Sequence, residues 1–252
     1  MTNRVAMDSL QVSPLLRLPL FSDLSGAAQA RLEKAAFFQQ QPAGAILFEQ
    51  GDNAQFLHVI LSGRVALVGE APTLEAELAG QEQGDHHPAA EREAIIEMFS
   101  AGEVVTAAAV LLQLPYMMSA RVQAPARIAF VPGDLVREFL DTEAAFAKQM
   151  ALMLARHWRL LSRQLKDQKL RSGTQRLCGY LLSLVSGAQE GPVEIDLPID
   201  RRTLASWLGM TAENLSRSLA QLKPLGLHIS GRHAQVDDIA RIRAFSLEDD
   251  LR

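Results

Sequence analysis

Residues 201–222 hold the pattern that most constrains the fold of this chain. Two short amphipathic segments follow one another there, with Gly209 between them. In both segments the leucines recur at helical spacing, which gives each segment one apolar face. Glycine accepts the backbone conformation of a tight turn, and the hydroxyl of Thr211 can cap the second helix by accepting a hydrogen bond from a free amide. The pattern predicts a helix-turn-helix.

The polar face of the second predicted helix carries residue types that can read DNA bases. Glu213, Ser216 and Arg217 lie on it at helical spacing. In helix-turn-helix proteins the start of the second helix enters the major groove, where arginine pairs with guanine and glutamate accepts a hydrogen bond from cytosine. A plain surface helix pair with a solvated polar face is the alternative. The predicted DNA-binding residues are Arg201, Arg202, Thr211, Glu213, Asn214, Ser216 and Arg217.

A short β-hairpin is expected directly after this helix pair. Pro224 ends the second helix, because proline cannot continue a helical hydrogen-bond pattern. Residues 227–229 and 234–236 then form two candidate strands around the turn Ser230-Gly231-Arg232. Such a hairpin is typical of the wing of a winged helix-turn-helix domain.

These motifs resemble a known family. The segment from Thr203 to Leu227 is similar to the DNA-binding domain of the Crp/Fnr family of bacterial transcription regulators, and Glu213-x-x-Ser216-Arg217 is similar to the E-x-x-S-R signature of its Fnr-type branch. The resemblance implies that these three side chains contact bases of a TTGAT-like half-site, and that double-stranded DNA and RNA polymerase are partners. The chain also resembles the nitric-oxide-responsive Dnr/Nnr branch.

The net charge of −4 is unevenly distributed along the chain. Between Arg156 and Arg232, twelve Lys or Arg residues stand against six Asp or Glu residues, a local net charge of +6. Because DNA presents a local line of phosphates, this distribution matters more than the total. A basic run on helices is also what a solvated helix face looks like, so the charge supports DNA binding without establishing it.

Composition excludes several classes of protein. With 48% hydrophobic and 21% charged residues the chain is typical of soluble globular proteins, and its length suits two modest domains. It has no apolar run near the roughly 18 residues of a membrane span and no signal-peptide core, so we expect a cytoplasmic protein without membrane contact. The single cysteine, Cys178, excludes an internal disulfide and an all-cysteine iron–sulfur cluster.

The first part of the chain predicts a β-rich domain. Helical residues are expected around Pro14–Phe21 and Ser25–Ala36, and short β-rich pieces with Gly-containing turns follow them, as in a jelly-roll-like barrel. The expected strands are Ala45–Phe48, Phe56–Ser62, Arg64–Val68, Ala94–Phe99, Ser119–Ala124 and Ala126–Val131. The turns expected at Glu49–Asp52 and Leu61–Val65 resemble those of the cyclic-nucleotide-binding β-roll, the sensory domain of Crp/Fnr proteins.

The same resemblance gives the positions where a cyclic nucleotide would bind. Gly102-Glu103-Val104-Val105 matches the turn before the ribose-binding pair, so that pair would fall at Thr106 and Ala107. The phosphate-binding pair would fall at Met118 and Ser119. A thioether cannot neutralise a phosphate as arginine does, so we expect no cyclic AMP.

Haem stays open as a cofactor. The candidate ligands are His58, His86, His87 and His157. His86 and His87 lie in a polar insertion and suit a solvated loop, whereas His58 alternates with apolar strand residues and suits a core. His157 lies at a helix seam, where a packed or cross-dimer histidine is the alternative.

A long helix is expected over Thr142–Gln168. Its apolar residues recur every three or four positions over about 40 Å, which exceeds what one small domain covers, although packing against its own barrel is the alternative. The predicted dimerisation residues are Phe146, Met150, Met153, Leu154, His157 and Leu161. A parallel pair of these helices would place two recognition helices on successive major grooves of a palindrome.

The sequence therefore predicts an α+β protein in three parts. These are a β-roll sensor domain at 1–141, a dimerisation helix at 142–169 and a winged helix-turn-helix DNA-binding domain at 170–252. The predicted function is a homodimeric transcription regulator, not an enzyme, that responds to redox or nitrogen-oxide status, with haem as one means of sensing. The alternatives are a haem-dependent enzyme or gas-binding protein that uses the winged helix for assembly, and a ligand-independent regulator.

Overall fold

The structure is a computed structural model that describes residues 13–70, 93–185 and 190–247. These residues fall into two compact units. The first unit lies within Met1–Gly69 and Glu97–His157, and the second lies within Glu70–Ile96 and Trp158–Arg252. No helix in the described ranges is long and apolar enough to cross a membrane.

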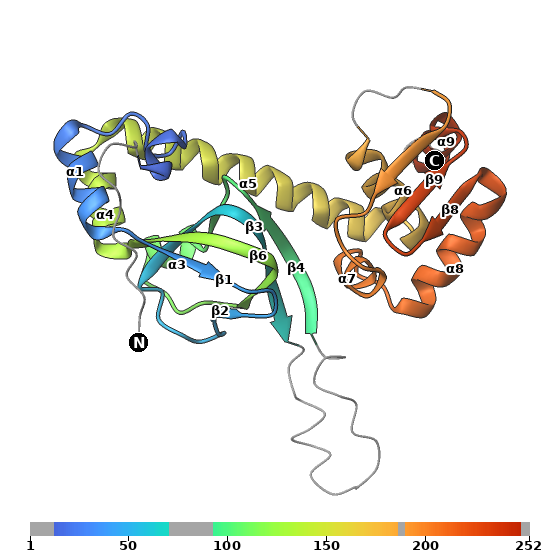
Figure 1. Ribbon diagram of the computed structural model, residues 1–252, viewed down its shortest axis with the longest axis horizontal. Coiled ribbons are helices and arrows are strands. Elements are labelled where there is room, and N and C mark those ends of the chain that lie inside the picture. The colour runs from blue at the N-terminus through green and yellow to red at the C-terminus, as the bar shows by residue number, and fades with distance from the viewer. Residues whose placement is uncertain (1–12, 71–92, 186–189, 248–252) are drawn as a thin grey trace, which may run out of the picture. The chain divides into compact units, whose positions relative to one another are not determined.

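The first unit is built on a β-sheet whose strand order is β1-β6-β3-β4, with β2 also paired to β6 and β5 to β3. Figure 1 shows β3 and β6 as its long central strands, and they pair antiparallel along most of their length. The strands are β1 (Phe37–Gln41), β2 (Ile46–Phe48), β3 (Phe56–Glu70), β4 (Glu93–Ser100), β5 (Val104–Val105) and β6 (Ser119–Pro132).

The turn expected at Leu61–Val65 is wrong, because β3 runs through this segment without reversing. Gly63 has a φ of +86°, and the pairing register with β6 shifts on both sides of it. A Cβ on Gly63 would lie 2.3 Å from the carbonyl oxygen of Pro125. The glycine therefore lets two backbones approach at a bulge inside one long strand, where we had expected two strands.

Helices cover the core of the first unit. They are η1 (Pro14–Arg17), α1 (Gly26–Ala35), α3 (Ala107–Leu112) and α4 (Gly133–Thr142). Their apolar side chains, such as Leu32 and Phe139, pack with inward residues of β3 and β6 in one continuous cluster. A second cluster inside the sheet is rich in aromatic rings and includes Phe48, Tyr116 and Phe130.

The long helix predicted after the sensor is confirmed as α5 (Ala144–Leu170). Phe146 and Met150, which we had expected at a dimer interface, are each 1% exposed and belong to the core of the first unit. Met153 and Leu154 pack partly against the same core. The N-terminal half of α5 therefore fastens the helix to its own sensor domain, as the alternative interpretation held.

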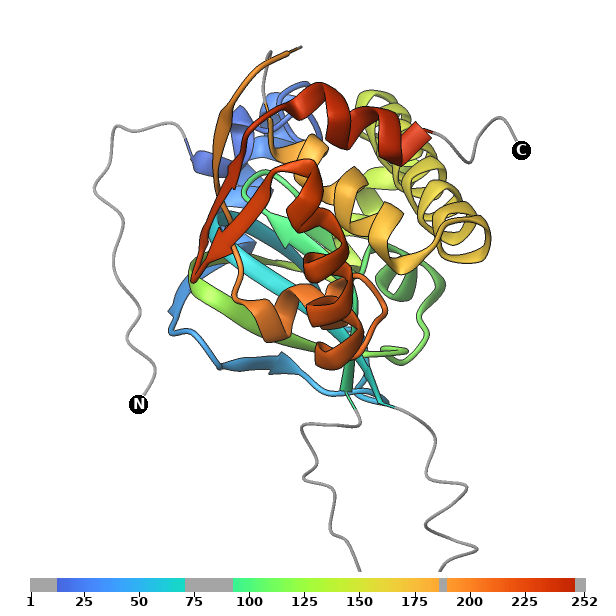
Figure 2. The same cartoon turned by 90° about the vertical axis from the view of Figure 1, so that its right-hand side faces the viewer.

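The second unit has helices on a three-stranded antiparallel sheet of order β7-β9-β8. The predicted helix pair and hairpin are present, and β7 and α9 were not predicted. The elements are α6 (Gly173–Leu184), β7 (Val193–Asp196), α7 (Arg201–Trp207), α8 (Ala212–Leu222), η3 (Lys223–Leu225), β8 (Leu227–Ser230), β9 (His233–Val236) and α9 (Ile239–Leu247). Figure 2 shows α8, in orange-red, beside the hairpin of β8 and β9.

Candidate nucleic-acid interface

Helices α7 and α8 are each fixed at their first residue by a side-chain cap. Asp200 accepts a hydrogen bond from the Thr203 amide at 2.9 Å, and the Thr211 hydroxyl accepts one from the Asn214 amide at 3.1 Å. The capping role expected for Thr211 is therefore confirmed, and each cap satisfies a backbone donor that the helix itself leaves free.

The turn between the two helices depends on Gly209, whose φ is +63°. This left-handed conformation is one that residues with a Cβ rarely adopt. The amide of Met210 then donates to the carbonyl of Ala205 at 3.0 Å, which closes the turn.

Helix α8 divides cleanly into a buried face and an exposed face. Leu215, Leu219 and Leu222 are at most 7% exposed, and this face packs into the second unit. The opposite face is exposed and carries Ala212, Glu213, Asn214, Ser216 and Arg217. The side chains predicted to read bases therefore share one solvent-facing surface at the start of a capped helix.

On this surface Glu213 and Arg217 form an ion pair, with 2.7 Å between Oε1 and Nη2. Both side chains are more than two-thirds exposed, so the pair contributes only a few tenths of a kcal/mol to helix stability. Such a weak pair can exchange for base contacts at little cost. The Ser216 hydroxyl donates back to the Ala212 carbonyl at 3.0 Å and keeps its lone pairs for an incoming donor.

Arg201 and Arg202 occupy the first turn of α7 and are exposed. The helix dipole is positive at this end, so cations there do not stabilise the helix. That both side chains contact DNA stays a prediction.

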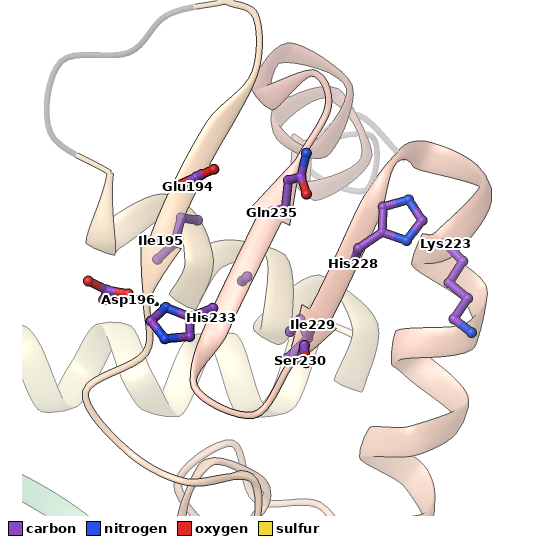
Figure 3. A pocket seen from close by; sticks show the side chains of 10 residues that line it. Glu194, Ile195, Asp196, Lys223, His228, Ile229, Ser230, His233 and Gln235 are labelled. Carbon is purple, nitrogen blue, oxygen red and sulfur yellow. Dashed lines mark hydrogen bonds and ion pairs between the residues drawn. The ribbon is translucent and has the colours of Figure 1, made fainter.

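The wing presents two different surfaces. Its tip, Gly231-Arg232, is exposed and basic. The outer face of the sheet, seen in Figure 3, forms a shallow hollow of about 470 Å³. Glu194, Asp196, Lys223, His228, His233 and Gln235 are among the residues that line it.

The hollow carries groups of both charge signs, because Glu194 and Asp196 line it together with Lys223 and two histidines. The ring of His233 lies with its Nδ1 2.6 Å from Asp196 Oδ1, and Glu194 is exposed on the same face (Figure 3). The two carboxylates repel phosphate and Lys223 attracts it, so the charges of the hollow give no uniform preference for or against DNA.

The positions that would hold a cyclic nucleotide lack a cation. Ala107 is 7% exposed at the start of α3, and Met118 packs against the aromatic cluster of the sheet. The Thr106 hydroxyl donates to the carbonyl of Val105, and the Ser119 hydroxyl accepts from the amide of Gln50 at 3.0 Å. None of these four side chains can neutralise a buried phosphate.

The His58 side chain is enclosed by aromatic rings. It is 3% exposed, and its ring centre lies 5.1 Å from that of Phe48 and 4.9 Å from that of Phe130. Burial lowers the pKa of His58 to about 4, and its Nδ1 has no hydrogen-bond partner among the described residues. A haem plane on His58 would have to displace these rings, so the packing does not fit that group.

His157 is engaged with a buried carboxyl group. Its Nδ1 lies 3.3 Å from Oε1 of Glu97, which is 6% exposed, and the Phe99 ring stacks on it. Burial, with a smaller effect from Glu103, raises the pKa of Glu97 to about 7. Burial also lowers the pKa of His157, against the opposing effect of Glu103.

Sequence reasoning missed the pairing of Glu97 with His157. The available signal was strand alternation, since Glu97 and Phe99 share one face of β4. The other two haem candidates, His86 and His87, lie outside the described residues. Within the described ranges, no group of three or more His, Cys, Asp or Glu side chains could hold a metal ion.

Comparisons with known proteins find one matching domain family in the first part of the chain and another in the second part. Residues 38–143 match the cyclic nucleotide-binding domain, and residues 175–245 match the Crp-like helix-turn-helix domain.

Over 232 residues the chain is 22% identical to the CRP-like cAMP-activated global transcriptional regulator of Mycobacterium tuberculosis. The aligned region covers 90% of this chain and 96% of that protein. It is also 35% identical to the transcriptional activator protein FnrL of Cereibacter sphaeroides over 91 residues. This shorter aligned region covers 35% of this chain and 37% of that protein.

A solved structure supports the fold. The chain is similar to CooA from Carboxydothermus hydrogenoformans, with a TM-score of 0.66 and 17% identity over 96% of this chain and 99% of that chain. The predicted order of a cyclic-nucleotide-binding β-sheet domain, helices and a C-terminal helix-turn-helix is therefore confirmed.

Proposed function

We propose that this chain, a Crp/Fnr-type transcription regulator with a DNA-binding helix-turn-helix, binds a palindromic TTGAT-like site as a homodimer. The observation that carries the proposal is the exposed face of α8. Glu213, Ser216 and Arg217 stand there together, with the start of the helix fixed by the Thr211 cap. This is the end of a recognition helix that enters the major groove.

Gel-shift titration on a TTGAT-type palindrome tests this proposal. We expect the palindrome to bind in the affinity range of specific sites and a duplex of scrambled sequence to bind far more weakly. Equal affinity for the two duplexes would contradict sequence-specific recognition. The salt concentration must be the same in all titrations, because phosphate contacts make both affinities salt-dependent.

The proposed dimer interface is a stripe on α5 formed by Leu154, Trp158, Leu161 and Leu165. Their spacing of four, three and four residues is that of a coiled-coil seam. Trp158 is 73% exposed and Leu165 is 54% exposed in the single chain, so both are free to pack on a second copy. Leu154 and Leu161, the other two members of the stripe, are half-buried.

This interface differs from the predicted set in its first residues. Phe146 and Met150 are occupied in the core of their own chain, so we leave them out. His157 faces Glu97, and Met153 packs on the sensor core. The stripe keeps Leu154 and Leu161 from the predicted residues and adds two side chains that the single chain leaves exposed.

We propose that the sensor acts by shifting a population between inactive and active dimers. A signal in the first unit would alter the packing of α5 and with it the orientation of the recognition helices. The family resemblance favours redox or nitrogen-oxide status as the signal, and it favours RNA polymerase as a partner in the cytoplasm.

Haem bound through His58 is not part of this mechanism, because the packing around that side chain does not fit haem. A ligand-independent regulator is the second candidate, and the filled aromatic cluster around His58 favours it. Absorbance near 400 nm in the purified protein distinguishes haem-bearing from haem-free protein, since only bound haem absorbs strongly there. A strong band would contradict the ligand-independent candidate, and a band that the substitution His58→Phe abolishes would contradict our interpretation of the His58 surroundings.

A further inference from the structure

Arg176, in the first turns of α6, binds the ends of two other helices of the second unit. Its Nε donates to the carbonyl of Leu208 at 3.0 Å, and its Nη1 donates to the carbonyl of Arg171 at 2.9 Å. A longer contact of 3.5 Å joins Nη2 to the carbonyl of Gly209. Arg171 directly follows α5, and Leu208 and Gly209 form the turn between α7 and α8.

These carbonyls are of the kind that most needs a cationic partner. The last carbonyls of a helix lack an intrahelical donor and lie at the negative end of its dipole. The planar guanidinium presents several N–H groups in a fixed fork. One arginine side chain can therefore bind two separate helix ends and fix the distance and angle between them. A lysine ammonium is a single point charge and cannot fix both directions together.

The start of α6 also contacts the recognition helix itself. The Thr174 hydroxyl lies 3.0 Å from Ser218 Oγ and 3.0 Å from Gln221 Oε1, both on α8. A Cβ on Gly173 would lie 2.9 Å from the methyl carbon of Met210, which shows how closely α6 approaches the turn.

A capping box keeps this first turn of α6 rigid. The Ser172 hydroxyl accepts from the Gln175 amide, while the Gln175 side chain accepts from the Ser172 amide at 2.8 Å. Arg176 therefore projects from a rigid first turn. This turn of α6 contacts the end of α5 and the turn between α7 and α8 through Arg176, and it contacts α8 through Thr174.

We propose that Arg176 is a positioning residue for DNA binding, which couples the end of α5 to the recognition helix without touching DNA. In a dimer joined through α5, this coupling sets the separation and angle of the two recognition helices. It therefore determines which half-site spacing is bound best. The proposal rests on the proposed function, because spacing has meaning only for a dimer on a palindrome.

The test compares the full-length protein with the variants Arg176→Lys and Arg176→Gln on palindromes of stepped half-site spacing and on a single half-site. Arg176→Lys keeps the charge but loses the fork. We expect its affinity for the best palindrome to fall about tenfold or more, the spacing preference to flatten and the half-site affinity to change little. Arg176→Gln should flatten the spacing preference further. The melting temperature of each variant is measured beside its titration, so that a loss of folding is distinguished from a loss of binding.

The matched control is Arg171→Met, which removes a neighbouring guanidinium and its 3.1 Å ion pair with Asp167 but keeps the carbonyl that Arg176 binds. We expect it to keep the wild-type spacing preference. Unchanged spacing preference in Arg176→Lys, or an equal fall on palindrome and half-site, would overturn the coupling role. If the wild-type protein shows no preference for palindromes, the proposed function itself fails.

Discussion

At the scale of single residues, the proposed base contact of Arg217 can be tested, since this side chain is exposed on α8, where it forms an ion pair with Glu213. We expect Arg217→Ala to lose about 1 to 3 kcal/mol of binding free energy per half-site on the cognate palindrome, because a bidentate base contact disappears. Gel-shift titration on cognate and random duplexes measures this loss.

The matched control for this prediction is Arg232→Ala at the wing tip, which should weaken binding to both duplexes alike. An equal loss on cognate and random DNA in Arg217→Ala would show that Arg217 contacts only phosphate.

Glu97 supplies a pH-dependent contribution to stability. Its folded-state pKa of about 7 lies above its ordinary value of 4.5, so the folded chain holds this proton more tightly than the unfolded chain. That contribution is complete below the ordinary value and is lost as pH rises through about 7. His157 acts in the opposite sense, since its lowered pKa costs stability as pH falls below 6.5.

The variant Glu97→Gln should therefore lose less thermal stability than the wild type between about pH 6 and about pH 8. Thermal unfolding across this range measures the difference. Glu138→Gln is the control, because the ion pair with Arg31 lowers the pKa of Glu138 and keeps it ionised throughout. Parallel pH profiles of wild type and Glu97→Gln would contradict the assignment.

At the scale of elements, the exposed stripe on α5 gives a direct test of assembly. The double variant Trp158→Glu with Leu165→Glu places like charges across the proposed seam, and both positions are exposed in the single chain. We therefore expect folded monomers that have lost palindrome binding.

Sedimentation measures the mass of this variant, and circular dichroism confirms its fold. The control is Leu160→Glu, a leucine that is 43% exposed but lies off the stripe, and it should remain a dimer. A dimer in the double variant would show that another surface joins the two chains.

Sequence reasoning succeeded for elements whose signals are local. The Thr211 cap, the turn at Gly209 and the leucine spacing of α7 and α8 lie close together in the sequence, and they indicated the candidate interface. It failed where contacts between distant segments decide the outcome. Gly63 signalled a turn in sequence, and only the approach of Pro125 shows that it marks a bulge.

The two faces of α5 posed the same difficulty. Both carry apolar residues, and periodicity alone cannot tell which face packs on the sensor and which one is free. Phe146 and Met150 were therefore assigned to the wrong surface for a dimer seam, because their burial depends on α1, α4 and the sheet. Arg176 went unnoticed because its partners are backbone carbonyls, which leave no trace in side-chain patterns.

At the scale of the whole molecule, cyclic AMP should not act as the effector. Burying a phosphate beside Thr106, Ala107 and Met118 leaves its charge uncompensated, which costs about 3 to 5 kcal/mol and turns a micromolar site into a millimolar one. Calorimetric titration of the full-length protein with cyclic AMP and cyclic GMP measures this. Binding tighter than about 100 μM would overturn the pocket assignment.

The mixed charge of the hollow on the wing sheet has a consequence for how the proposed regulator would search a chromosome. Glu194 and Asp196 line this hollow together with Lys223, whereas Arg232 at the wing tip is exposed. We expect phosphates to gain little from the hollow, because attraction and repulsion offset each other there, and to gain more from the wing tip. A duplex that meets the tip would then stay bound for longer, so that the wing helps the search without adding a base contact.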